Sequence, residues 1–141
     1  MANLALRHPN STGLGKWIWD AQRLVDYLHT LPVVDRSRIA IMGHSLGAKM
    51  SLYAAAMEER ICAVVFSEGG IGLKFSNYED YWYLGARVET LPPGTDQHEL
   101  LGLIAPRPFL LIAGESADKD AGWHYINAAR SSTPPARYGN G

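Results

Sequence analysis

Residues 38–48 read RIAIMGHSLGA, and this short stretch decides the fold. A β-rich run leads into the pattern G-x-S-x-G, and a run of helix-forming residues follows it. This order is typical of a nucleophile elbow, in which a strand delivers a serine to a sharp turn and the next helix points its N-terminus at the same place. Ser45 is therefore a candidate nucleophile, and the chain is a candidate hydrolase. The alternative is a plain glycine-rich turn between a strand and a helix.

Three neighbours of Ser45 support the same interpretation. Gly43 and Gly47 flank it at two residues on either side. A strained turn brings the backbone of these positions close together, so we expect side chains to clash at both. Leu46 begins the predicted helix, and its backbone N–H is a candidate donor to an oxyanion.

The composition is that of one globular domain. The chain has 141 residues, of which 47% are hydrophobic and 19% are charged, and its formal net charge is −1. This charge argues against nucleic acid or an anionic membrane as a partner, and no apolar run is long enough to span a bilayer. Without a signal-peptide pattern at the N-terminus, the default expectation is a cytoplasmic protein. No group of side chains has metal-ligand spacing, so the sequence predicts no metal and no other cofactor.

Predicted strands and helices alternate along the chain. Helices are expected over 16–31, 46–58 and 121–130, and strands over 38–42, 61–67 and 107–113. This alternation predicts an α/β fold, with a parallel sheet that has helices on both faces. The segment 68–104 has a mixed pattern, and the tail 131–141 is expected to be disordered.

Two carboxylates follow predicted strands, where reactive groups of a parallel sheet gather. Glu68 comes just after the second strand, and Asp118 comes just after the third. Either one is a candidate for the acid that orients a histidine beside the serine. Glu115 and Asp120 are weaker candidates for the same role.

The histidine that would take the serine proton is harder to assign. In the chain order typical of this fold it follows the acid at some distance. Only His124 follows Asp118, and it lies at the start of a predicted helix, too close to the acid for the usual loop. His44 is adjacent to Ser45, so its side chain is expected to point elsewhere. His98 fits a surface or packing role better.

Several motifs together resemble the α/β-hydrolase superfamily. The likeness is to its dienelactone-hydrolase and acetyl-xylan-esterase-like branch and, further, to glucuronoyl esterases. The residues that carry it are 13–17, 43–50, 67–73, 82–85 and 103–108. The resemblance covers about residues 13–130 and implies one partial domain over residues 1–141. It also implies a serine hydrolase that acts on a small-molecule or carbohydrate ester through an acyl-enzyme at Ser45.

The same resemblance bears on the choice between Glu68 and Asp118. It also implies which parts of the family's fold are expected outside the matching segment. In the glucuronoyl-esterase-like group the acid can follow the strand after the elbow, which favours Glu68, whereas the commoner pattern favours Asp118. The family's early strands, with the second oxyanion donor, are expected before residue 1, and its histidine loop after residue 130. The strand 38–42 would then have an unpaired edge, which predicts self-association.

Alternatives to an esterase stay open. A serine peptidase of the prolyl-oligopeptidase type has the same elbow, although it normally has a propeller domain upstream. Without a catalytic histidine, the chain is instead an inactive binding domain or a vestigial one. The aromatic residues Phe75, Trp82 and Tyr83 fit a pocket wall or a lid as well as they fit core packing.

Overall fold

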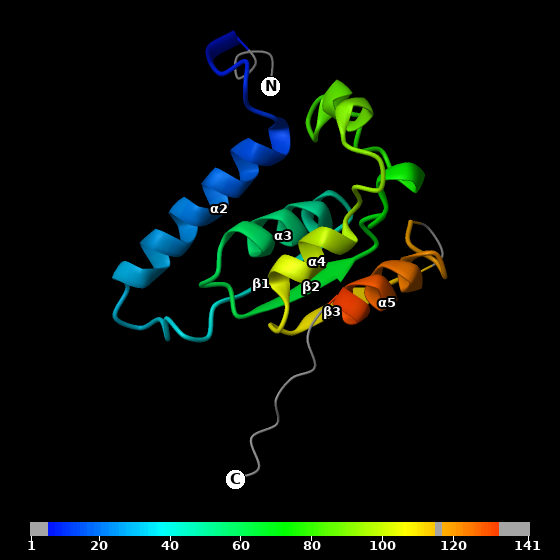
Figure 1. The fold of residues 1–141 in the computed structure, drawn as a ribbon. Helices are drawn as coiled ribbons and strands as arrows, with labels where there is room; N and C mark the ends of the chain where they lie inside the picture. Colours follow the sequence, from blue (N-terminus) through cyan, green and yellow to red (C-terminus); the bar gives the residue numbers. More distant parts are fainter. Residues whose placement is uncertain (1–5, 115–116, 133–141) are drawn as a thin grey trace.

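The computed structural model describes residues 6–114 and 117–132 and shows a parallel sheet packed against helices (Figure 1). The strands lie in the order β1-β2-β3, and both neighbouring pairs are parallel. The α/β fold predicted from the sequence is confirmed. The elements are α2 (Gly13–Thr30), β1 (Ala40–His44), α3 (Leu46–Met57), β2 (Ala63–Ser67), η1 (Leu73–Phe75), η2 (Gly85–Thr90), α4 (His98–Ile104), β3 (Phe109–Ile112) and α5 (Gly122–Ser132).

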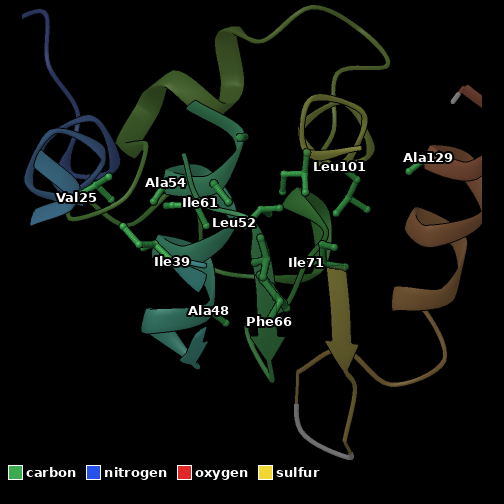
Figure 2. Close-up of a cluster of buried hydrophobic side chains, with 14 residues drawn as sticks. Val25, Ile39, Ala48, Leu52, Ala54, Ile61, Phe66, Ile71, Leu101 and Ala129 are labelled. Atoms are coloured by element: carbon green, nitrogen blue, oxygen red, sulfur yellow. The ribbon is translucent and has the colours of Figure 1, made fainter. Parts of the chain in front are cut away.

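The main hydrophobic core lies around α3 (Figure 2). This helix contacts β1, β2, α2 and α4, so it is apolar on most of its surface. Ala48, Ala54 and Ala55 are fully buried and let the backbone of α3 come close to its neighbours. Leu52 and Phe66 supply much of the volume of this core.

The two faces of the sheet differ in how the described residues cover them. Side chains on the side away from α3 are exposed: Met42 by 78%, Leu110 by 54% and Ile112 by 46%. Successive side chains of a strand point to opposite faces, so these three residues mark one continuous open face. Between residues 6 and 132, outside the gap at 115–116, the helices therefore lie on one face of the sheet, and the predicted cover on the second face is not found there.

The helix α2 begins three residues before its predicted start at residue 16. The side-chain oxygen of Thr12 accepts a hydrogen bond from the N–H of Gly15 at 3.0 Å and caps the helix. A Cβ on Gly13 would lie 2.0 Å from the carbonyl oxygen of Trp82. The helix can therefore begin here only because glycine lets its first turn pack on a segment that is distant in the sequence. Leu14 continues this contact into a second core cluster with Leu73, Tyr78 and Tyr83.

The observed helices α4 and α5 also differ from the elements predicted from the sequence. The helix α4 lies within the segment predicted only as mixed, because seven residues give little periodicity. The helix α5 extends to Ser132 and so includes the first residues of the predicted tail, while 133–141 lie outside the described residues. None of the helices in the described part of the chain is both long and apolar enough to cross a membrane.

Candidate active site

Ser45 occupies a strained turn between β1 and α3. Its φ is 55° and its ψ is −117°, a conformation that residues with side chains rarely adopt. Its N–H donates to the carbonyl of Ser67 at 2.8 Å, and its carbonyl accepts from the N–H of Ala48 at 3.0 Å. The side chain caps no N–H of α3, and the residue is exposed. The turn therefore presents the Ser45 hydroxyl to solvent at the carboxyl end of β1.

The two glycines of the elbow are not equivalent. A Cβ on Gly43 would lie 2.0 Å from the carbonyl oxygen of Gly47, so only glycine fits at residue 43. A Cβ on Gly47 would meet nothing within 4 Å among the described atoms. The expectation of a clash at both positions is therefore wrong for Gly47. The reason is that a Cβ on Gly43 would clash with the backbone of Gly47, whereas a Cβ on Gly47 would point into open space.

Leu46 is the first residue of α3. The N–H groups in the first turn of a helix have no intrahelical partner, so this donor is available beside Ser45. Such a group can bind the oxygen that becomes negative when an ester carbonyl is attacked. Its role as an oxyanion donor stays a prediction.

Glu68 lies beside Ser45 along the edge of the sheet. His44 pairs with Ser67 at the ends of β1 and β2. Ser45 follows His44 directly, and Glu68 follows Ser67. Glu68 also has a positive φ, of 51°, and its N–H donates to the carbonyl of Ile112 at 3.0 Å. Its Oε2 accepts a hydrogen bond from the N–H of Ala117 at 3.0 Å.

The position of the Glu68 carboxylate depends on a glycine at the end of β3. A Cβ on Gly114 would lie 1.7 Å from Oε1 of Glu68, so any other residue would displace the carboxylate. Glu68 thus depends on a glycine at Gly114, as the turn at Ser45 depends on a glycine at Gly43. The sequence alone did not single out Gly114.

Asp118 is in a different environment from Glu68. It is 1% exposed, and both of its carboxylate oxygens accept backbone hydrogen bonds. Oδ2 accepts from the N–H of Gly70 at 3.0 Å, and Oδ1 accepts from the N–H of Ile71 at 2.5 Å. Asp118 therefore holds the loop that follows Glu68. Of the weaker candidates, Asp120 is exposed, and Glu115 lies outside the described residues.

The histidines lie at several places around the sheet. Nδ1 of His44 is 3.2 Å from the hydroxyl of Ser67 on β2. His98 and His124 line a cavity beside α5. His29 is on α2, and its Nε2 is buried. In the part of the chain that the structure describes, no imidazole makes a hydrogen bond to the hydroxyl of Ser45.

Lys49 is a buried cation that the sequence analysis did not select. It lies on α3 one helical turn after Ser45 and is 4% exposed. Its ammonium group donates to Oδ1 of Asn77 at 2.8 Å and lies 4.9 Å and 4.7 Å from the ring centres of Tyr78 and Tyr83. Burial lowers the pKa of Lys49, and nearby carboxylates oppose this shift. A lone lysine in an otherwise uncharged helix was the feature of the sequence that could have revealed it.

The described residues of this region form no metal site. Among residues 6–114 and 117–132, no group of three or more histidine, cysteine and carboxylate side chains is placed to hold a metal ion. What the arrangement does offer is an exposed serine hydroxyl, a carboxylate after the neighbouring strand, and a free helical N–H. These are groups for nucleophilic attack on a carbonyl.

Comparison with known proteins agrees with this reading of the fold. Residues 7–81 match a family model described as fungal glucuronyl esterase. A 4-O-methyl-glucuronoyl methylesterase from Phanerochaete carnosa is 30% identical over 136 residues, in an alignment that covers 77% of this chain and 32% of the relative. A polyketide transferase from Stachybotrys chlorohalonatus is 32% identical over 124 residues, in an alignment that covers 86% of this chain and 39% of the relative. A CE15 glucuronoyl esterase structure from Teredinibacter turnerae is 30% identical, with a TM-score of 0.69 over 82% of this chain and 33% of that one.

The sheet and these matches define an esterase family with the α/β-hydrolase fold. The chain belongs to the glucuronyl esterase family, also called CE15. It spans about a third of the length of the curated relatives that it matches.

Proposed function

We propose that Ser45 is the nucleophile of a carboxylic-ester hydrolase that works through an acyl-enzyme. The observation that supports this most is the elbow itself, because its strained φ of 55° has no evident benefit other than exposing the hydroxyl. The matching family is an esterase family, which favours an ester over a peptide as substrate. Its relatives are named as 4-O-methyl-glucuronoyl methylesterases, so we propose an ester of a sugar acid.

The reaction would proceed in two halves. The oxygen of Ser45 attacks the ester carbonyl while an imidazole base takes the hydroxyl proton, and the N–H of Leu46 binds the oxyanion. The C–O bond to the alcohol then breaks, the alcohol leaves with that proton, and the acyl group stays on Ser45. Water attacks the acyl-enzyme in the same way, so the free acid is released and the serine hydroxyl is restored.

We propose Glu68, in preference to Asp118, as the carboxylate that orients the base. Glu68 follows the strand that pairs with the strand of Ser45, and it is only partly buried. Asp118 is 1% exposed and already accepts backbone hydrogen bonds at both oxygens, so it presents little surface to a histidine. Asp118 therefore acts as the residue that positions the Glu68 loop.

The other readings of the sequence have less support. The finer likeness to dienelactone hydrolases and acetyl xylan esterases rests on the sequence motifs and stays a prediction. A peptidase has no specific observation in its favour. An inactive binding domain is favoured by one observation, that no described imidazole makes a hydrogen bond to Ser45.

Ester turnover by matched variants tests the proposal. The substrates are the methyl ester of 4-O-methyl-glucuronate and p-nitrophenyl acetate, each with and without imidazole in the buffer as an external base. We expect hydrolysis above the level of the Ser45→Ala variant, and a loss in Glu68→Gln that is larger than the loss in Asp120→Asn. Equal rates for the wild type and Ser45→Ala under every condition would support the inactive domain instead.

A further inference from the structure

We propose that a cavity beside α5, separate from the candidate active site, binds a small aromatic carboxylate. The cavity has a volume of about 570 Å³, within the range of small-molecule sites. It lies between η1, the segment that leads into α4, and α5, and neither Ser45 nor Glu68 lines it. Its lining includes Lys74, Phe75, Asp96, His98, His124 and Tyr125.

The apolar part of the cavity is a pair of aromatic rings. Phe75 and Tyr125 meet edge to face, with 5.8 Å between ring centres and 76° between ring planes. A Cβ on Gly72 would lie 2.3 Å from the ring of Phe75 and 2.3 Å from the hydroxyl of Tyr125, so both side chains pack on the backbone of Gly72. The pair is thus a preformed surface that can take a third ring edge to face.

Asp96, the one acidic group among the described lining residues, already accepts three hydrogen bonds. Oδ1 of Asp96 accepts from the N–H groups of Leu73 at 3.1 Å and Gln97 at 2.8 Å, and its Oδ2 accepts from the hydroxyl of Tyr125 at 2.9 Å. Burial, together with this hydrogen bond, raises the pKa of Tyr125. The hydroxyl therefore keeps its proton and directs it to Asp96. Little acceptor capacity is left for a ligand.

Every other polar side chain of the lining can donate a hydrogen bond, including Thr95. Lys74 has an ammonium group, and each of His98 and His124 has at least one ring N–H in any tautomer. No side chain in the described ranges accepts a hydrogen bond from these three. Donors and positive charge beside aromatic walls match a ligand with an acceptor-rich, negatively charged end and a flat apolar body. An aromatic carboxylate has this chemistry.

Titration of the ¹⁵N-labelled 141-residue chain with benzoate, followed by NMR, tests the proposal. Benzyl alcohol serves as the neutral aromatic control and acetate as the carboxylate without a ring. We expect shift changes at residues 73–75, 95–98 and 121–128, and a Kd for benzoate at least about fivefold lower than for either control. Lys74→Ala should raise the Kd for benzoate at least about threefold, while Lys16→Ala, a matched lysine on α2, should leave it unchanged.

A second variant separates the charge argument from simple cavity filling. Tyr125→Phe frees an oxygen of Asp96 and adds an acceptor to the cavity. The variant should therefore bind benzoate more weakly and benzyl alcohol more tightly than the wild type does. The proposal is overturned if shifts appear outside these residues, if benzyl alcohol binds as well as benzoate, or if Lys74→Ala and Lys16→Ala behave alike. Ser45→Ala should leave benzoate binding unchanged, so this outcome is independent of the proposed esterase activity.

Discussion

Glu68 and Asp118 hold each other's loops through reciprocal hydrogen bonds. Glu68 accepts from the N–H of Ala117 at 3.0 Å, and Asp118 accepts from the N–H of Gly70 at 3.0 Å. Each carboxylate therefore binds the backbone next to the other one, across the loops that follow β2 and β3. Both residues fit the acid role in the sequence, and burial separates them, since Asp118 is 1% exposed and Glu68 is only partly buried.

We expect substitution of Asp118 to destabilise the fold. Asp118→Asn replaces one acceptor oxygen by an NH₂ group that would face a backbone donor, and the cost should be about 2–3 kcal/mol in the free energy of unfolding. Urea denaturation measures this cost. The matched control is Asp120→Asn, an exposed aspartate two residues further on, which should change stability by less than about 0.5 kcal/mol. Equal effects of the two substitutions would contradict a clamping role for Asp118.

The two glycines of the elbow should respond differently to alanine. Gly43→Ala places a Cβ 2.0 Å from a carbonyl oxygen, so we expect loss of the folded state or a cost above about 3 kcal/mol. Gly47→Ala meets no described atom within 4 Å and lies in the first turn of α3, where alanine favours the helix. It should be neutral or stabilising by up to about 1 kcal/mol. Thermal unfolding of both variants measures these effects on stability. Equal changes in the two variants would contradict the prediction.

The buried Tyr78 and the partly buried Tyr53 should respond differently to loss of the hydroxyl. The hydroxyl of Tyr78 is buried with no partner among the described residues, whereas that of Tyr53 accepts from Nε2 of Gln97 at 2.9 Å. Tyr78→Phe should therefore be neutral or stabilising by about 1 kcal/mol, and Tyr53→Phe should cost about 1 kcal/mol. Urea denaturation of the pair is the measurement. A destabilised Tyr78→Phe would mean that this hydroxyl has a partner.

Alkaline pH should weaken the fold partly through Tyr53. Burial raises the pKa of Tyr53 to about 12, and Asp96 adds to the rise while Gln97 opposes it. In the unfolded chain a tyrosine titrates near pH 10, so the unfolded state loses this proton first. The contribution of Tyr53 is complete below about pH 10 and is lost as the pH rises to about 12, by roughly 2–3 kcal/mol. The free energy of unfolding of the wild type minus that of Tyr53→Phe, measured by urea denaturation across this range, should fall by that amount and so change from positive to negative. Parallel curves would contradict the prediction.

The sequence predicted the elements whose patterns are local. The strand, the elbow and the helix around Ser45 lie within two residues of their predicted bounds, because alternation, the G-x-S-x-G pattern and an apolar helical run all act over a few residues. The start of α2 was missed because Gly13 is needed for a contact with Trp82, a residue far away in the sequence. Nothing near Gly13 reports that contact.

The candidate site was predictable in its parts but not in its arrangement. Ser45 and both carboxylates could be selected because each follows a predicted strand. The choice between Glu68 and Asp118 depends on how two loops meet in space, and the need for glycine at Gly114 depends on where the Glu68 side chain lies. Contacts between loops have no periodicity, so the sequence does not reveal them.

Covalent trapping shows directly whether Ser45 is the nucleophile. The chain is mixed with p-nitrophenyl acetate, with imidazole as an external base, quenched in acid during the first turnover, and digested for peptide mass spectrometry. We expect one acetyl group on the peptide that contains Ser45, and none at that peptide in Ser45→Ala. An unmodified Ser45 peptide, or the same acetylated peptides in wild type and variant, would mean that Ser45 is not the nucleophile.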